Sequence, residues 1–334
     1  MEIRRGASSV RTVELDSALD SAGGWQVTRG MNRRRFLAGA ASVAAWAGSR
    51  AADPTKAEKE TPRPKAPAVG SQLYGWGQYY GRQGKDLSKH LDDVLGALRD
   101  AGYDYAEGSL DVGTPDNNGK FAERLRKKGL RPVSLYTGGA AHVLGQATQT
   151  CERIAKAARE AAKAGFGIIN FNPDPIGRPK TDRELEVQAD ALAELGEELS
   201  RMGVRLGIHH HTPELANGGL EFHSNFRRTR PEHVGFCYDV HWVYRGGLAP
   251  GPVLAEHGGR VVSWHLRQSR GQTWWEDLDT GDIDYAMIAS EVARRRLPQF
   301  LTVELAIEAG TSITRDVVEN HARSRRFVRS VFGV

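Results

Sequence analysis

The amino-acid sequence predicts an α/β fold, a single closed (β/α)8 TIM barrel that follows an N-terminal export segment. Two observations lead to this prediction. From residue 69 onward, eight short apolar runs alternate with longer segments whose apolar residues recur at helical spacing, a pattern typical of a parallel sheet covered by helices. The length of this region is also close to the roughly 250 residues that such barrels usually occupy.

The strands and helices can be assigned in order along the chain. The predicted strands cover residues 71–76, 103–107, 132–136, 167–171, 205–209, 235–239, 261–265 and 301–305. Two intervening segments carry apolar residues at helical spacing: Leu91, Val94, Leu95 and Leu98, and Leu185, Leu192, Leu195 and Leu199. Glycines stand where helices should end: Gly102, Gly129, Gly165 and Gly203. The main alternative is an open doubly wound sheet, in which a glycine-rich phosphate-binding turn follows the first strand. Residues 75–77 are Gly-Trp-Gly, with aromatic neighbours, and do not match that turn.

The segments before the barrel predict export. The run Arg33-Arg34-Arg35-Phe36-Leu37 and the small, apolar residues after it are typical of a twin-arginine signal peptide, which we assign to residues 31–51. Met31 directly precedes this signal, so residues 1–30 are interpreted as an upstream extension foreign to the native protein. Residues 52–67 form a predicted linker, and residues 68–334 the catalytic domain.

The signal has consequences for localisation and partners. Its apolar stretch is too short for a permanent membrane span. We therefore expect transport by the twin-arginine translocase and a periplasmic or otherwise extracytoplasmic product. The sequence is also compatible with a homo-oligomer.

Charge and cysteine content exclude other classes. The net charge is +5, and residues 1–67 carry 12 Lys and Arg against 7 Asp and Glu, so the rest of the chain is neutral. A neutral domain offers no basic surface to phosphates, and we expect no nucleic-acid partner. Cys151 and Cys237 are predicted to be free thiols, because Cys237 lies in an apolar run that suits a buried strand.

Polar residues stand at the C-terminal ends of the predicted strands, where barrels of this kind hold their chemistry. They are Glu107 after the second strand, His209, His210 and His211 after the fifth, Asp239 and His241 at the sixth, His265 and Arg267 at the seventh, and Glu304 at the eighth. The last four strands are neighbours around a barrel. Two imidazoles and two carboxylates converging there would be costly to bury without a cation. Mixed nitrogen and oxygen donors favour Mn²⁺, Co²⁺, Fe²⁺ or Zn²⁺ as the divalent metal.

Several short motifs carry a family resemblance. They are GSQLY at 70–74, NPDP at 172–175, YDVHW at 238–242, HLR at 265–267, GDIDY at 281–285 and VE at 303–304. With these motifs, residues 69–334 resemble the xylose isomerase-like barrels described as sugar phosphate isomerases/epimerases. The resemblance implies that His209, Asp239, His265 and Glu304 hold the metal. It also implies that His241 and Arg267 bind substrate hydroxyls.

One position departs from the family pattern. The ketose epimerases of this family carry a glutamate on strand five that is both a metal ligand and one of two opposed acid/base groups, and this sequence has His209 there. The His-x-His of strand five is similar to the inosose-dehydratase and keto-glycoside-lyase branches instead. His211 lies on the same face of the strand as His209, so either residue could be the ligand.

These observations predict a metal-dependent sugar isomerase or epimerase that acts on a keto-sugar or polyol. The base would be Glu304, the returning acid Glu107, His211 or His241, and Arg267 would stabilise the enediolate. A metal-dependent lyase or dehydratase is the main alternative, followed by a non-catalytic sugar-binding barrel. A DNA-repair endonuclease of the same fold is disfavoured by the neutral charge of the domain.

Overall fold

The computed structural model describes residues 66–334, which contain a closed barrel of parallel strands. The barrel strands are β1 (Ala68–Gln72), β2 (Tyr105–Ser109), β3 (Ser134–Gly139), β4 (Ile168–Pro173), β5 (Arg205–Ile208), β6 (Val234–Asp239), β7 (Val261–Leu266) and β10 (Phe300–Val303). They are hydrogen-bonded in the order β1-β10-β7-β6-β5-β4-β3-β2, and β1 also pairs with β2. The predicted (β/α)8 barrel is therefore confirmed.

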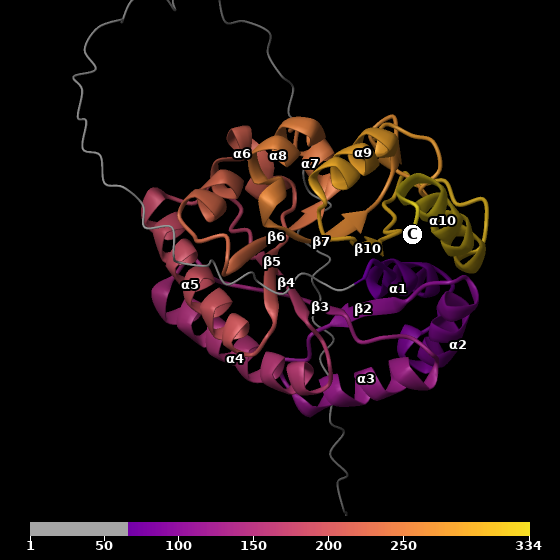
Figure 1. The fold of residues 1–334 in the computed structure, drawn as a ribbon, viewed down its shortest axis with the longest axis horizontal. Coiled ribbons are helices and arrows are strands. Elements are labelled where there is room, and N and C mark those ends of the chain that lie inside the picture. Colours follow the sequence, from indigo (N-terminus) through magenta and orange to yellow (C-terminus); the bar gives the residue numbers. More distant parts are fainter. Residues whose placement is uncertain (1–65) are drawn as a thin grey trace, which may run out of the picture. The chain divides into compact units, whose positions relative to one another are not determined.

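Helices surround the strands on the outside of the barrel (Figure 1). They are α1 (Leu73–Arg82), α2 (Leu87–Asp100), α3 (Asp116–Lys127), α4 (Leu144–Lys163), α5 (Asp182–Arg201), α6 (Thr212–Arg227), α7 (Val240–Arg245), α8 (Pro250–His257), α9 (Tyr285–Arg295) and α10 (Val317–Phe332). Within residues 66–334, no helix has the length and apolar character needed to cross a membrane. The predicted extension 1–30, the signal 31–51 and nearly all of the linker 52–67 lie outside the described residues.

Glycine ends several helices, as the sequence predicts. Gly102, Gly129, Gly165 and Gly203 all have positive φ, between 75° and 97°. This left-handed conformation costs glycine little, and it turns the chain out of the helix toward the next strand. The apolar stripes are also confirmed, since Leu95, Leu98 and Leu199 are fully buried in the core.

The first strand differs from its predicted range of 71–76. It ends at Gln72, whose side chain accepts a hydrogen bond from the backbone N–H of Tyr74 and so caps α1. Gly75 lets this helix pack closely on the chain after β10, since a Cβ there would lie 2.5 Å from the Leu305 carbonyl oxygen. Trp76 is therefore a buried helix residue, and its indole N–H donates to Ser71 Oγ at 3.1 Å.

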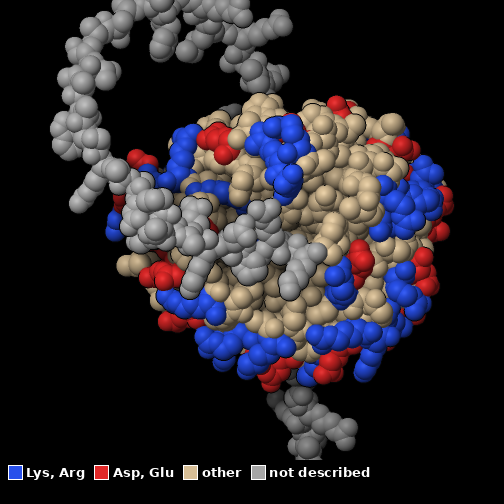
Figure 2. Space-filling view, viewed as in Figure 1, with Lys and Arg blue, Asp and Glu red and all other residues tan. Residues whose placement is uncertain are grey.

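Both cysteines are free, as predicted, and Cys237 is buried in β6. On the face of the molecule drawn in Figure 2, Lys and Arg side chains are interspersed with Asp and Glu around the edge. This mixed surface agrees with the neutral charge that the sequence assigns to the barrel.

Candidate functional site

Four of the predicted ligands meet at the C-terminal ends of adjacent strands. His209 follows β5, Asp239 ends β6, His265 lies in β7 and Glu304 follows β10. Each offers a nitrogen or oxygen atom, these atoms all lie within 4.8 Å of one another, and all four residues are buried. The parallel order of the strands thus brings together residues from distant parts of the chain at one point.

Two buried atoms of this quartet form no hydrogen bond. His265 Nδ1 and Glu304 Oε2 are 2.9 Å apart. Within the described residues, neither has a hydrogen-bond partner, although Glu304 Oε2 forms an ion pair with Arg267. A cation in contact with both atoms would satisfy the bonding capacity that they leave unused. The donors therefore fit a divalent metal ion.

Glu107 fixes the orientation of His265 from behind. Its Oε1 lies 2.7 Å from His265 Nε2, the imidazole nitrogen that faces away from Glu304. The ring then donates its Nε2–H to the carboxylate, and Nδ1 is the nitrogen directed at the quartet. The other oxygen, Oε2, accepts from Ser134 Oγ and from Asn170 Nδ2 at 2.8 Å. With both oxygens engaged, Glu107 is placed to position His265. Its role as a catalytic acid stays a prediction.

The structure places His209, rather than His211, in the quartet. His209 Nε2 lies 3.4 Å from Asp239 Oδ2, and its Nδ1 lies 3.3 Å from Asn172 Oδ1. The ring of His211 packs beside it with 4.8 Å between centroids and reaches Trp242 on its other side. Burial lowers the pKa of His211 to about 3, so its imidazole is neutral near pH 7. The remaining histidine of the run, His210, packs among phenylalanine rings away from the site.

Arg267 supplies the positive charge of the site. Its Nη2 donates to Asp239 Oδ2 at 2.8 Å and forms an ion pair with Glu304 Oε2 at 3.2 Å. Burial is the largest single influence and raises the pKa of both carboxyls, but Arg267 acts together with neighbouring histidines against it. The net effect lowers the pKa of Asp239 far below its ordinary value and that of Glu304 to about 2. Both carboxylates are therefore ionised and able to bind a cation.

Aromatic rings hold the Arg267 side chain in place. Its guanidinium lies 5.1 Å from the ring centroid of Trp242 and 4.5 Å from that of Trp274. Each contact is a cation–π interaction. Behind it, the Tyr285 hydroxyl is 2.8 Å from the backbone nitrogen of Arg267 and 2.5 Å from its carbonyl oxygen. The GDIDY motif therefore anchors the chain that carries the arginine.

His241 is buried beside the same rings. Its centroid lies 5.9 Å from Trp242 and 5.7 Å from Trp274. In the described part of the chain, neither of its ring nitrogens has a hydrogen-bond partner. Burial and the nearby Arg267 lower its pKa to about 3. This neutral imidazole has a free donor and a free acceptor, which suits the predicted contact with a substrate hydroxyl.

A short hairpin supplies Trp274. It consists of β8 (Ser269–Arg270) and β9 (Thr273–Trp274). The indole is 9% exposed and forms part of the wall against Arg267. Its backbone N–H donates to Glu308 Oε1 at 2.9 Å, and Glu308 in turn binds Arg245 at 2.8 Å. These contacts hold the ring in place against the site.

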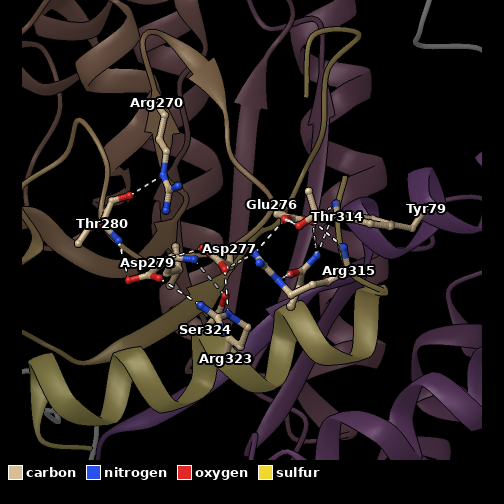
Figure 3. Close-up of polar contacts among 12 residues, drawn as sticks. Tyr79, Arg270, Glu276, Asp277, Asp279, Thr280, Thr314, Arg315, Arg323 and Ser324 are labelled. Atoms are coloured by element: carbon tan, nitrogen blue, oxygen red, sulfur yellow. Dashed lines mark hydrogen bonds and ion pairs between the residues drawn. The ribbon is translucent and has the colours of Figure 1, made fainter. Parts of the chain in front are cut away.

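The chain after this hairpin is tied to α10 by buried carboxylates (Figure 3). Glu276 accepts hydrogen bonds from Thr314 and Asn320 and pairs with Arg315 at 2.9 Å. Asp277 pairs with Arg315 at 2.6 Å and with Arg323 at 3.1 Å. The network fixes the loop that begins directly after Trp274.

Comparison with known proteins places the fold. The family model described as "Xylose isomerase-like TIM barrel" matches residues 95–330. The chain belongs to this family. No curated protein sequence matches it. The resemblance inferred from the motifs is thus confirmed at the level of the family.

Solved structures with the same fold include several sugar-converting enzymes. A sugar phosphate isomerase/epimerase from Parabacteroides distasonis is 19% identical, with 80% of this chain and 95% of that chain covered and a TM-score of 0.64. A D-allulose 3-epimerase from Methylomonas sp. is 14% identical, with 80% and 98% covered and a TM-score of 0.64. The E. coli 3-keto-D-glucoside 4-epimerase is 14% identical, with 79% and 100% covered and a TM-score of 0.59. At these identities the likeness establishes the fold.

Two contributors to the site were not predicted from the sequence. Asn172 contacts His209, and Tyr285 anchors Arg267. Asn172 and Tyr285 lie in the NPDP and GDIDY motifs, so the motifs marked the correct segments. Their roles depend on contacts with other strands, which no local pattern reveals.

Proposed function

We propose that this protein is a divalent-metal-dependent isomerase or epimerase of a keto-sugar or polyol. The observation that carries the proposal is the buried quartet of two histidines and two carboxylates, in which His265 Nδ1 and Glu304 Oε2 lie 2.9 Å apart and neither forms a hydrogen bond within the described residues. The family and the sugar epimerases among its structural neighbours support the substrate class.

The ion would be held by His209, Asp239, His265 and Glu304. When bound, it would polarise a substrate carbonyl and acidify the adjacent C–H bond. Glu304 would remove the carbon-bound proton, because it is ionised and is the most exposed of the four side chains, at 9% against 1% for each of the others. The Arg267 guanidinium would stabilise the negative charge that then develops on the substrate oxygen.

The neutral imidazole of His241 would orient a substrate hydroxyl through its unpaired nitrogens. The indole of Trp274 would exclude water from Arg267 and so keep its electrostatic effect strong. Glu107 would maintain the tautomer of His265 that leaves Nδ1 free for the ion.

A lyase is the second candidate, and His209 is the observation that favours it. A histidine in this position removes the second of the two opposed carboxylates that ketose epimerases use. Glu304 would then be the one carboxylate base of the pair that remains. A single base suffices for proton removal followed by loss of a β-substituent.

The deciding experiment measures proton–deuterium exchange at carbon. Purified protein is analysed for metal, then incubated in D2O with a panel of keto-sugars and 3-keto-glycosides. Deuterium at an epimerised carbon supports the isomerase, and an unsaturated product supports the lyase. Binding of sugar with neither exchange nor elimination by the metal-loaded protein would mean a sugar-binding barrel without catalysis.

The matched variants are Glu304→Gln and Glu319→Gln. The first should slow exchange by about 10²- to 10⁴-fold, the contribution expected of a general base. Glu319 is an exposed carboxylate on α10, and its replacement should leave the rate unchanged. Equal rates in the two variants would remove Glu304 from the mechanism.

We also propose that the enzyme acts outside the cytoplasm, on the basis of the twin-arginine signal in residues 31–51. Replacing both Arg33 and Arg34 with Lys should retain the protein in the cytoplasm. Cell fractionation measures this, and unchanged export of the double variant would contradict the assignment.

A further inference from the structure

A second group of potential metal donors lies on the outer helices, away from the barrel mouth. His223 belongs to α6, while Glu256 and His257 end α8. His223 Nδ1 and His257 Nε2 are 3.0 Å apart, and each lies 3.5 Å from Glu256 Oε1. The two helices lie beside each other in Figure 1.

These distances match the geometry of a tetrahedral metal site. Zinc binds imidazole nitrogen and carboxylate oxygen at about 2.0–2.2 Å, which in a tetrahedron separates any two donors by about 3.3–3.5 Å. The observed triangle of 3.0, 3.5 and 3.5 Å is close to one face of that tetrahedron. One ion could contact all three donors with only small side-chain movements.

Hydrogen bonding alone satisfies this group less well. A single proton between His223 and His257 accounts for only the 3.0 Å contact. Glu256 then relies on Arg227, whose Nη2 lies 3.2 Å from the same Oε1 and whose side chain is 68% exposed. An ion would replace this exposed partner and satisfy all three donors together.

The surroundings hold the donors in position. His257 is 6% exposed, and its ring packs on Phe222 at 5.2 Å and on Phe226 at 4.9 Å. Glu256 is 45% exposed, so the group is open to ions from solvent. The donors are thus partly held in position and still accessible to an ion from solvent.

We propose that His223, Glu256 and His257 form a second site for a zinc-class divalent ion, separate from the barrel mouth and without a catalytic role. The ion would tie α8 to the second half of α6. That half follows an interruption at residues 216–219, where Asn217, Gly218 and Gly219 have positive φ. Binding would therefore stabilise a helix that is weakened in its middle.

Zinc titration of the full chain tests this proposal. His223→Gln and Glu256→Gln should each bind one Zn²⁺ fewer per chain than the wild type and lose part of the rise in melting temperature caused by Zn²⁺. Arg227→Gln is the matched control, since Arg227 contacts Glu256 but cannot bind a cation, and it should keep the wild-type stoichiometry.

The outcomes separate the two sites. If the wild type binds two ions and His223→Gln binds one, both sites are present. If the wild type binds one ion and His223→Gln binds none, the peripheral site is present and the barrel-mouth site is absent. Equal stoichiometry in the wild type, His223→Gln and Glu256→Gln, all folded by circular dichroism, would overturn the proposal.

Discussion

Replacing Glu107 with Gln should weaken metal binding at the barrel mouth. The carboxylate is completely buried and accepts the Nε2–H of His265 at 2.7 Å, while its other oxygen accepts from Ser134 and Asn170. An amide has only one oxygen. If that oxygen faces His265, the amide NH2 points at the Asn170 donor. In the opposite orientation the amide NH2 points at His265 Nε2 and favours the tautomer with hydrogen on Nδ1. That hydrogen occupies the position at which Nδ1 would bind the metal.

The expected loss is about 10- to 100-fold in metal affinity, the usual effect of removing a carboxylate that orients a histidine ligand. This corresponds to about 1.4–2.7 kcal/mol. The mismatched donor should also lower the free energy of unfolding by about 1–3 kcal/mol. Ser134→Ala is the control, because it removes one hydrogen bond from the far oxygen and keeps the His265 contact, so metal affinity should change little.

The assay is a competitive metal titration of both variants, followed by the rate of proton exchange at saturating metal. If Glu107 only positions His265, Glu107→Gln should recover most of the wild-type rate of proton exchange once metal is saturating. Unchanged metal affinity together with a rate at least about 10²-fold lower would mean that Glu107 takes part in proton transfer, since a fall of that size is the effect of losing an acid/base group.

Three further predictions concern other parts of the chain. Burial and the nearby Glu221 raise the pKa of Glu214 to about 8. Between about pH 4.5 and 8 this carboxyl is protonated in the folded chain and ionised in the unfolded chain. The free energy of unfolding of the wild type should therefore fall as pH rises through this range. Glu214→Gln should thus raise the melting temperature at pH 8 and have no effect below pH 4.5, and a pH-independent shift would contradict this. Trp274→Ala should lower kcat/KM about 10-fold, because a buried cation–π contact with Arg267 is lost. The metal content of this variant should stay constant. Wild-type kinetics would exclude a role for the indole. A chain that begins at Ala68 should melt within a few degrees of the full chain by calorimetry, because β1 starts there; an insoluble product would place part of the fold upstream.

Much of the architecture could be predicted because its signals are local. The apolar residues of α2 and α5 recur every three or four positions, and the glycines that end helices follow directly after them. The first strand was misplaced because residues 73–76 are apolar and aromatic, as in a strand. Capping by Gln72 and the close packing of Gly75 on Leu305 decide in favour of a helix, and that second contact joins residues far apart in the chain.

The number of strand–helix units and the chemical types of the donors at the strand ends could be predicted from the sequence, since both follow from residue type and short-range spacing. Which donors meet at the barrel mouth depends on contacts between distant strands. Glu107 and His265 are 158 residues apart, yet they form a hydrogen bond. His209 and His211 are indistinguishable by spacing, and only His209 contacts Asp239 and Asn172 on the two neighbouring strands. Closing the barrel creates these contacts, because it brings the ends of distant strands into one small volume.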